Sequence, residues 1–471
     1  MPADADPSTA DDALLARPRA VHVVGVGGAG MSAIATVLAA MGHRVSGSDL
    51  KESAGLDRLR AAGVAVTVGH DAANLGPAVD LVAISTAVPP TNPEVQAARA
   101  RGVAVLRRAE ILAAIAATRA TVAVAGTHGK TTTSSMLALV LVEAGLHPSF
   151  IIGGEVNEIG SGAVWDDGES FVVEADESDG TFLELPRRAA IVTNVEPDHL
   201  EHWGGVEGLY AGFARFVAET DGPVVLCADD VEAARLAVGA GPSAVTYGTA
   251  VDADYRMVGL TSSREGCRFE VVHEGDVVAR VAMPLTGEHN ARNACGALVA
   301  GLLLGAPADA AERALGRFAG VARRFQFRGE AAGATLVDDY AHLPTEVRAA
   351  LAAARDGGWG RVVCVFQPHR YSRTSALWPD FAEAFDAADV LVVTDIYPSG
   401  EAPRPGVTGK LVADAVLDAH PRRRLAYLPT LDDVVAFLER ELRPGDLCLT
   451  LGAGDLTVVP DRVRESLGAA G

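Results

Sequence analysis

The chain of 471 residues is poor in cysteine, in aromatic residues and in lysine. Its five cysteines are dispersed without a CxxC pair, which argues against a disulfide framework and against a structural zinc site. We expect them to be small core side chains in a reducing compartment. Aromatic residues make up only 5% of the chain, so aliphatic side chains must build most of the core. The cysteines are Cys227, Cys267, Cys295, Cys364 and Cys448.

Long apolar runs are also missing. The longest, such as residues 294–306, are too short to span a membrane. Residues 1–18 are polar and lack the apolar segment of a signal peptide. These absences predict a cytoplasmic protein without membrane insertion.

Positive charge is scarce, and the formal net charge is −21. A surface this acidic repels phosphate backbones, which excludes generic nucleic-acid binding. An anionic ligand therefore needs a local site. With 49% hydrophobic and 21% charged residues, the chain can form buried cores, and at about 150 residues per domain we expect three domains.

Strand-like β-branched runs alternate with Ala-rich helical stretches, a pattern typical of α/β domains with parallel sheets. The pattern restarts at a strand over residues 20–24, at a second over residues 121–125, and near residues 323–327. The alternating segment 254–280 predicts an insertion or a sheet edge. We predict a disordered tail over 1–18 and domains over 19–118, 119–322 and 323–471.

A first Gly-rich loop, GVGGAG, follows the strand at 20–24 and precedes a helix. Its glycines let the backbone approach a phosphate, and Asp49 at the end of the next strand can accept from a ribose hydroxyl. The fingerprint fits any nucleotide diphosphate, and an NAD-linked oxidoreductase is one alternative. A tight turn without a ligand is another.

A second Gly-rich loop, GTHGKTT, lies between the strand at 121–125 and a helix from Thr131. It is a short variant of the phosphate-binding loop, since Val124 stands where the longer motif has glycine. Its backbone N–H groups can donate to phosphates, and Lys130 can neutralise the charge of the β- and γ-phosphates. The Thr131 hydroxyl can bind Mg²⁺. The chain has three lysines against 37 arginines, so a lysine kept in this loop indicates that a compact ammonium is needed.

Two polar strand ends could hold the metal. The strand at 171–174 ends in Glu174 and further acids, and a second strand runs into the turn that carries His199. A histidine in such a turn is often only a hydrogen-bonding residue. The phosphate loop and the acidic strand end together favour a ligand role.

Three further groups follow in the second half of the chain. The helix start at 287–293 offers amides for adenine or ribose edges, with N-capping as an equal alternative. Arg324 lies at a predicted domain junction, where it could reach a phosphate. Arg370 and Arg373, together with Tyr and His side chains, form a candidate carboxylate pocket.

These motifs together resemble the Mur ligase family over residues 21–455. The segments that carry the resemblance are GVGGAGMSAIA, SGSD, GTHGKTTT, EADESD, TNVEPDHLEH, GEHNARN, RRFQ, DDYAHLPTE, FQPHRYSRT and YPSGEAP.

The resemblance implies a three-domain Mur ligase architecture. A Rossmann-like N-terminal domain would bind the UDP part of a sugar nucleotide, a central P-loop ATPase domain would follow, and a Rossmann-like C-terminal domain would complete the chain. It implies a ligase that uses ATP and two Mg²⁺ ions to join an amino acid to the lactyl carboxylate of UDP-N-acetylmuramate through an acyl phosphate, in peptidoglycan synthesis. The HRYSRT and YPSGEAP segments favour L-alanine over the tripeptide used by a recycling member. The oligomeric state is left open between monomer and homodimer.

The resemblance also implies roles for individual residues. The resemblance assigns catalytic roles to Lys130, Glu174, His199, His342, Arg370 and Arg373. It assigns metal binding to Thr131, Glu174 and His199. It assigns ATP binding to Gly126, Thr127, His128, Gly129, Lys130, Thr131, Thr132, His289, Asn290, Asn293 and Arg324. It assigns sugar-nucleotide binding to Gly25, Gly27, Gly28, Ala29, Gly30, Asp49 and Ser85. It assigns amino-acid binding to Tyr340, His342, Arg370 and Arg373.

The chain departs from the family pattern at two points. Leu343 stands where the family usually has a second histidine, so no catalytic role is expected of that position. No lysine lies between Lys130 and Lys410, so the carbamylated lysine of several sister ligases has no counterpart.

Overall fold

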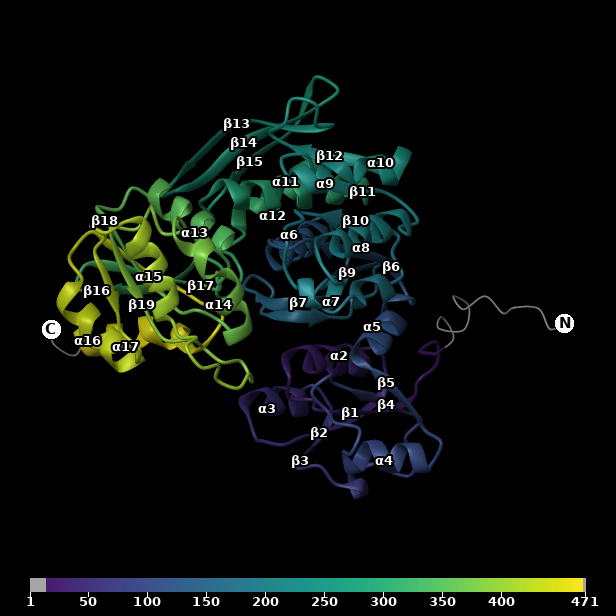
Figure 1. Cartoon of the computed structure of the whole chain (residues 1–471). Helices are drawn as coiled ribbons and strands as arrows, with labels where there is room; N and C mark the ends of the chain where they lie inside the picture. Colours follow the sequence, from purple (N-terminus) through teal and green to yellow (C-terminus); the bar gives the residue numbers. More distant parts are fainter. Residues whose placement is uncertain (1–13, 469–471) are drawn as a thin grey trace. The chain divides into compact units, whose positions relative to one another are not determined.

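The computed structural model describes residues 14–468 (Figure 1). Along the chain these residues form three β-sheets, and each sheet together with the helices that flank it is called a layer below. Their contacts divide them into two compact units. One extends to Val258 and includes Glu270–Arg280 and Arg292–Gly316, and the other holds Gly259–Phe269, Val281–Ala291 and the described residues from Arg317 onward. Within residues 14–468, no helix is long and apolar enough to cross a membrane.

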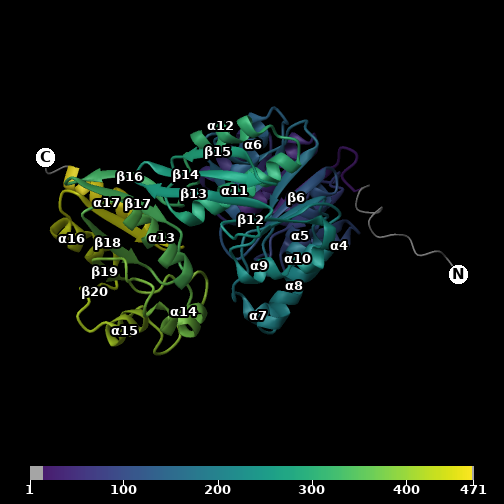
Figure 2. The same ribbon diagram turned by 90° about the horizontal axis from the view of Figure 1, so that it is seen from above.

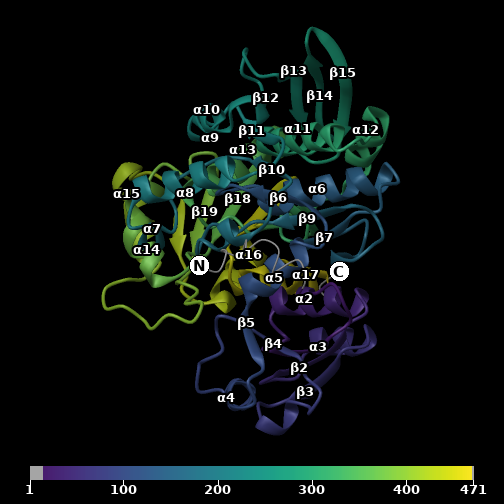
Figure 3. The ribbon, with the colours of Figure 1, turned by 90° about the vertical axis from the view of Figure 1, so that its right-hand side faces the viewer.

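The N-terminal layer is a five-stranded parallel sheet in the order β3-β2-β1-β4-β5. Helices α2, α3 and α5 pack on one face, and α4 packs on the other (Figure 3). The strands are β1 (Ala20–Val24), β2 (Arg44–Asp49), β3 (Ala65–Val68), β4 (Leu81–Ile84) and β5 (Ala104–Arg107). The helices are α2 (Ala29–Ala40), α3 (Ala54–Ala61), η1 (Ala72–Asn74), α4 (Pro93–Ala100) and α5 (Arg108–Ala116).

Because all five strands run parallel, their carboxyl ends meet at one edge of this sheet. The edge carries the loop from Gly25 to Gly30 after β1, Asp49 at the end of β2, and His70 just after β3. Ser85 follows β4, and Arg108 follows β5. A glycine-rich loop and polar residues from four further segments thus lie where open α/β sheets bind ligands.

The central layer is a sheet of ten strands in the order β15-β14-β13-β12-β11-β10-β6-β9-β7-β8. Strand β6 pairs in parallel with β9 and β10, and its residues from Thr121 to Ala125 are buried on both faces. Strands β13 to β15 occupy one edge, which confirms the edge predicted for residues 254–280. At the other edge β8 is antiparallel to β7, although we had expected parallel pairing.

The strands of the central sheet are β6 (Ala120–Ala125), β7 (Ser149–Val156), β8 (Ser161–Val164), β9 (Ser170–Glu174), β10 (Ala189–Val192), β11 (Val224–Cys227), β12 (Ala244–Gly248), β13 (Tyr255–Ser263), β14 (Gly266–His273) and β15 (Asp276–Met283). Its helices are α6 (Lys130–Glu143), η2 (Thr181–Glu184), α7 (Leu200–Trp203), α8 (Val206–Ala218), α9 (Val231–Arg235), α10 (Ala237–Ala240), η3 (Gly241–Ser243), α11 (Glu288–Leu303) and α12 (Ala308–Arg317).

The C-terminal layer is a six-stranded sheet in the order β16-β17-β21-β18-β19-β20, parallel except for the β16–β17 pair. Helices α13 and α15 pack on one face, and α16 and α17 pack on the other (Figure 2). Its strands are β16 (Gln326–Ala331), β17 (Ala334–Asp339), β18 (Arg361–Phe366), β19 (Val390–Val393), β20 (Leu425–Tyr427) and β21 (Asp446–Leu451). Its helices are α13 (Pro344–Asp356), α14 (Tyr371–Leu377), η4 (Trp378–Phe381), α15 (Lys410–Ala419), α16 (Leu431–Glu441), η5 (Asp455–Val458) and α17 (Val459–Gly468).

The structure bears on two sequence predictions, one about the cysteines and one about the N-terminal tail. All five cysteines are free and buried, as predicted. The predicted tail over 1–18 needs correction at its end, because Leu15 is 4% exposed and packs into the core that includes Val21. Residues 1–13 of that tail lie outside the described part of the chain.

Candidate active site

The second Gly-rich loop joins β6 to α6 in a geometry that only glycine allows at two positions. Gly126 has a φ of 133° and Gly129 a φ of 81°, both in the region that L side chains rarely adopt. A Cβ at Gly126 would lie 2.1 Å from Oγ1 of Thr193, and one at Gly129 would lie 2.5 Å from Oδ1 of Asn293. The loop therefore runs directly against its neighbours, and one of these is the predicted nucleotide residue Asn293.

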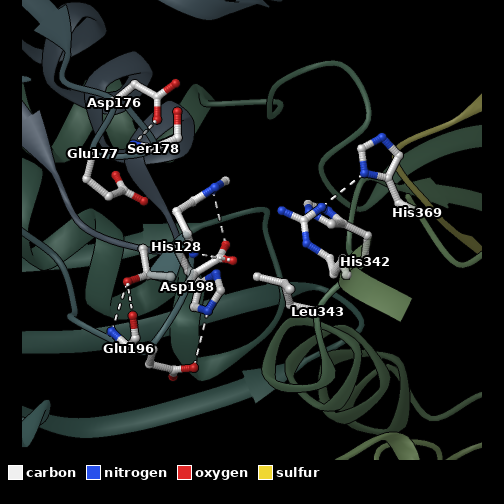
Figure 4. Close-up of polar contacts among 12 residues, drawn as sticks. His128, Asp176, Glu177, Ser178, Glu196, Asp198, His342, Leu343 and His369 are labelled. Atoms are coloured by element: carbon white, nitrogen blue, oxygen red, sulfur yellow. Dashed lines mark hydrogen bonds and ion pairs between the residues drawn. The ribbon is translucent and has the colours of Figure 1, made fainter. Parts of the chain in front are cut away.

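Residues that follow β10, a strand that pairs with β6 in the sheet, hold this loop in place. The backbone N–H of His128 donates to Oδ1 of Asn194 at 2.8 Å, and Thr127 Oγ1 accepts from the N–H of Glu196 at 2.8 Å. The imidazole Nε2 of His128 lies 3.3 Å from Oε2 of Glu196 (Figure 4). Both peptide and side-chain bonds thus fix the loop before any ligand arrives.

Lys130, the first residue of α6, lies against the acidic end of β9. Its Nζ donates to the carbonyl of Gly126 at 2.6 Å and to Oε1 and Oε2 of Glu177 at 3.1 and 2.9 Å. The side chains are 13% and 3% exposed. Burial lowers the pKa of Lys130, but Glu177, Asp176 and Glu174 more than offset it and leave that pKa above its ordinary value. Burial also raises the pKa of Glu177 to about 7, although Lys130 opposes the rise.

The backbone of Glu177 is held by an aromatic cluster. Nε1 of Trp203 donates to the carbonyl of Glu177 at 3.1 Å. The indole packs edge-on against Phe182, which in turn stacks on Phe216. The contact ties the acidic strand end to α7, the helix that starts next to His199.

Two of the three predicted metal residues touch each other. Oγ1 of Thr131 donates to Oε1 of Glu174 at 3.0 Å, and Oε2 of Glu174 accepts from the N–H of Gly153 at 2.8 Å. A hydroxyl and a carboxylate are the oxygen donors that Mg²⁺ prefers, so these two residues fit the predicted ion.

His199, the third predicted metal residue, contacts a carboxylate next to it in the chain. It precedes α7 with a φ of 52°, and its Nε2 lies 3.3 Å from Oδ2 of Asp198. In the part of the chain that the structure describes, sets of three His or carboxylate ligand atoms within 4.8 Å occur only around His147 and around His420. Neither set includes a predicted metal residue.

The predicted adenine-side residues all lie in the first two turns of α11. Asn293 is 8% exposed and faces the phosphate loop at Gly129. Asn290 is 7% exposed, and its Nδ2 donates to the carbonyl of Thr286 at 2.8 Å. This bond ties the Asn290 side chain to the residue four positions before it, whereas Asn293 lies against the loop. His289 lies at the second position of α11.

The first Gly-rich loop is braced by its own predicted ribose acceptor. Oδ2 of Asp49 accepts from the N–H of Gly27 at 2.8 Å. Gly25 has a φ of 78°, and a Cβ there would lie 3.6 Å from Cβ of Ser85. A Cβ at Gly30 would lie 3.0 Å from Nε of Arg108, a residue that the sequence analysis did not select. The signal that could have found Arg108 is its position directly after β5, at the carboxyl edge of the sheet.

The C-terminal unit brings the predicted carboxylate pocket together. The ring of His342 contacts those of Tyr340 and His369 at centroid distances of 5.4 Å each. The guanidinium groups of Arg323 and Arg324 lie over the Tyr340 ring at 5.0 and 5.1 Å. A ring of aromatic and basic side chains therefore surrounds Tyr340.

His369 is a second residue that the sequence analysis did not select, although it lies in the HRYSRT segment. Its Nδ1 accepts from Nη1 of Arg373 at 3.0 Å, the dashed line that starts at His369 in Figure 4. Burial, with His342 and Arg373 adding to it, lowers the pKa of His369 to about 3. A neutral His369 thus orients Arg373.

The neighbouring groups complete this pocket. Arg370 has a φ of 65°, and among residues 14–468 its Nε is buried without a hydrogen-bond partner. An orphaned guanidinium N–H of this kind suits an anionic ligand such as a carboxylate. Burial lowers the pKa of His342, whose Nδ1 lies 3.3 Å from Oε2 of Glu346. Leu343 is 7% exposed and directly precedes α13.

Comparison with known proteins matches all three layers. Three sequence profiles match in turn, described as Mur ligase family, catalytic domain, over residues 20–120, Mur ligase middle domain, over residues 124–301, and Mur ligase, glutamate ligase domain, over residues 323–454.

The chain is also similar to two curated relatives, each called UDP-N-acetylmuramate–L-alanine ligase. The one from Anaeromyxobacter sp. (strain Fw109-5) is 47% identical over 94% of this chain and 96% of its own, and the one from Kineococcus radiotolerans is 49% identical over 96% and 97%. Among solved structures, the UDP-N-acetylmuramate-alanine ligase of Thermotoga maritima matches with a TM-score of 0.80 and 29% identity, covering 96% of this chain and 100% of that one. The murein peptide ligase of Psychrobacter arcticus shares the fold, with a TM-score of 0.68 and 24% identity over 96% and 99% of the two chains.

Proposed function

The chain belongs to the Mur ligase family, with its three-domain architecture, and from this premise we propose that it joins L-alanine to UDP-N-acetylmuramate. The reaction consumes ATP and gives UDP-N-acetylmuramoyl-L-alanine, ADP and phosphate, as a step of peptidoglycan synthesis. The observation that carries the proposal is the 47–49% identity, over nearly the whole chain, to ligases that bear this name. The domains we assign to it are 19–118 for the sugar nucleotide, 119–322 for ATP and 323–471 for the amino acid, and the enzyme acts in the cytoplasm as a monomer or homodimer.

In the first half-reaction, the lactyl carboxylate attacks the γ-phosphate of ATP, and an acyl phosphate and ADP form. Carboxylate and phosphate repel each other, so the loop must supply positive charge. Lys130 offers its ammonium, while the N–H groups of Lys130 to Thr132, in the first turn of α6, lack intrahelical acceptors and are available to the phosphates. Thr131, Glu174 and His199 would hold Mg²⁺, two ions in all, which supply further neutralisation of phosphate charge. Asn293 supports the loop from Gly129, and His289, Asn290 and Arg324 complete the ATP site.

In the second half-reaction, the amine of L-alanine attacks the acyl phosphate, and phosphate leaves from a tetrahedral intermediate. Arg370 and Arg373 bind the alanine carboxylate, since one has a buried N–H without a partner and the other is oriented by His369. Tyr340 and His342 line the same pocket. His199 and His342 are the two candidates for taking the ammonium proton of alanine.

The sugar nucleotide binds at the carboxyl edge of the N-terminal sheet. The backbone from Gly25 to Gly30 approaches the diphosphate, with Gly27, Gly28 and Ala29 between them. Asp49 and Ser85 lie on either side of this loop, at the ends of β2 and β4. Family membership and the phosphate loop together argue against an NAD-linked oxidoreductase.

The deciding experiment measures ADP release with Mg²⁺, ATP and UDP-N-acetylmuramate, with L-alanine or the tripeptide as acceptor. We expect release that depends on L-alanine. Release only with the tripeptide would move the chain to the recycling reaction. Absence of release with either acceptor would contradict the proposed function, and binding of NADH would point to an oxidoreductase instead.

A further inference from the structure

A buried carboxylate lies behind the carboxyl edge of the N-terminal sheet. Glu94, in the first turn of α4, has a side chain that is 0% exposed. Its Oε2 accepts from Oγ of Ser48 at 2.6 Å, and its Oε1 accepts from Nδ2 of Asn74 at 2.6 Å. Every contact that these oxygens make is with a hydrogen-bond donor, so Glu94 is ionised and acts only as an acceptor.

This carboxylate also faces two histidines. Nε2 of His22 and Nδ1 of His70 each lie 3.5 Å from Oε2 of Glu94. Nδ1 of His22 lies 2.9 Å from Oγ of Ser46, so His22 is held within the sheet.

The contacts of Ser48 determine the tautomer of His70. Ser48 gives its single hydroxyl hydrogen to Glu94, so its oxygen can only accept from its other neighbour, Nδ1 of His70 at 3.0 Å. Nδ1 of His70 must therefore carry a hydrogen. In a neutral imidazole the second nitrogen then has a lone pair, so Nε2 of His70 is an acceptor.

Nε2 of His70 is available to a ligand. Among residues 14–468 it has no hydrogen-bond partner, and the side chain is 15% exposed. His70 follows β3, whereas Asp49 ends β2 and the Gly25 loop follows β1. A nucleotide with its diphosphate at this loop and its ribose at Asp49 directs its base toward β3 and His70.

We propose that Nε2 of His70 accepts the N3–H of a uracil ring, and that Ser48 and Glu94 are positioning residues that hold it in the accepting form. Uracil carries a hydrogen on N3. Cytosine has a lone pair there, which would face the lone pair of Nε2. This site therefore selects uridine nucleotides over cytidine nucleotides. The inference rests on the proposed function, because it takes UDP-N-acetylmuramate as the substrate.

The test measures the binding of UDP, CDP and 3-methyl-UDP to the full chain by calorimetry. Because the site loses a buried hydrogen bond with either analogue, we expect the wild type to bind UDP at least about tenfold more tightly than CDP or 3-methyl-UDP. His70→Ala weakens UDP binding about tenfold and leaves CDP binding unchanged, so the preference disappears. Ser48→Ala lets the ring adopt the other tautomer, which can donate to N3 of cytosine, and the preference falls.

A purely structural role for these residues would weaken UDP and CDP binding by the same factor, and that result would overturn the inference. Equal binding of UDP and 3-methyl-UDP by the wild type would overturn it as well, without any variant that has to fold. His147→Ala, at a side chain that is 63% exposed and lies outside this sheet, is the matched control and keeps the wild-type preference. L-alanine-dependent ADP release is measured in parallel. If it is absent while the UDP preference holds, the proposed function fails and the assignment of His70 to uracil stands.

Discussion

Nζ of Lys130 lies 2.9 Å from Oε2 of Glu177, so the cation of the phosphate loop is neutralised by the chain's own carboxylate. All three ammonium hydrogens have acceptors, because the carbonyl of Gly126 takes part as well. We expect a triphosphate bound at the proposed site to replace Glu177 as the partner of Lys130. The ion pair thus competes with the nucleotide.

Lys130→Ala should abolish ADP release, because no other lysine lies in the loop and the phosphates lose their charge partner. Binding of UDP should survive, since the first Gly-rich loop belongs to a separate sheet. ADP release and UDP calorimetry are the two measurements. Lys130→Arg is the matched control for charge, and we expect it to be inactive too, because the planar guanidinium does not fit a site built for a compact ammonium. Turnover near the wild-type rate in the alanine variant would remove Lys130 from the mechanism.

Glu177→Gln should bind ATP more tightly than the wild type. The substitution keeps the shape of the side chain but removes the charge that holds Lys130, so about a threefold to tenfold lower Kd is expected for the loss of one charged hydrogen-bond partner. Nucleotide titration followed by calorimetry measures it. An unchanged or weaker affinity would show that Glu177 does not compete with the phosphates.

Arg373→Ala should raise the KM for L-alanine about tenfold to a hundredfold and change the KM for ATP little. The expected size corresponds to a charge-assisted hydrogen bond worth about 1.5–3 kcal/mol. Arg355→Ala is the matched control, because Arg355, in α13 of the same unit, pairs with Asp389 and is 39% exposed. Equal alanine KM values for the two variants would exclude Arg373 from the pocket.

Gly129→Ala should destroy ATP binding, whereas Gly145→Ala should not. Both glycines have a left-handed φ, 81° and 70°, so both substitutions cost about 1 kcal/mol of backbone strain. Only at Gly129 does the new Cβ meet another group, Oδ1 of Asn293 at 2.5 Å, while Gly145 faces open space. ATP titration and thermal unfolding of the two variants separate the two effects. Loss of ATP binding in both would mean that strain alone explains it.

Glu94 should make stability depend on pH in the acid range. Burial acts to raise its pKa, but hydrogen bonds from His22, Ser48 and Asn74 outweigh burial and lower the pKa to about 2. A carboxyl with a depressed pKa stabilises the fold above its unfolded value near 4.5, and this contribution is lost as the pH falls toward 2.

The free energy of unfolding of the wild type should therefore fall relative to Glu94→Gln by about 2 kcal/mol between pH 6 and pH 3. Urea denaturation of both proteins at several pH values measures the difference. A constant difference over that range would contradict the depressed pKa.

The sequence predicted best those strands whose residues are uniformly apolar. Strand β1 has the predicted bounds and β6 differs from its predicted bounds by one residue, because a strand covered on both faces is a continuous apolar run in the sequence. Strand β3, with the sequence AVTV, lies at a sheet edge and is mostly exposed, so it gave no such signal. β8 and β16 pair antiparallel at edges, and apolar content carries no information about direction.

The candidate site was predictable where a motif is local. The glycines and Lys130 lie within one short loop, so their joint role could be inferred from spacing alone. Glu94 reads in the sequence as an ordinary acid in a first helical turn after Asn92 and Pro93. Only the packing of α4 against the sheet brings it to Ser48, which is why sequence reasoning did not select it.

The bond from the indole of Trp203 to the carbonyl of Glu177 gives the protein an optical reporter of its own. Indole emission responds to the polarity and hydrogen bonding around Nε1, and the partner here belongs to the residue that ATP must displace. With Trp165, Trp359 and Trp378 replaced by phenylalanine, the single remaining fluorophore would report the arrival of the nucleotide in real time. Stopped-flow emission of that variant would then time the release of Lys130 separately from the chemistry that follows.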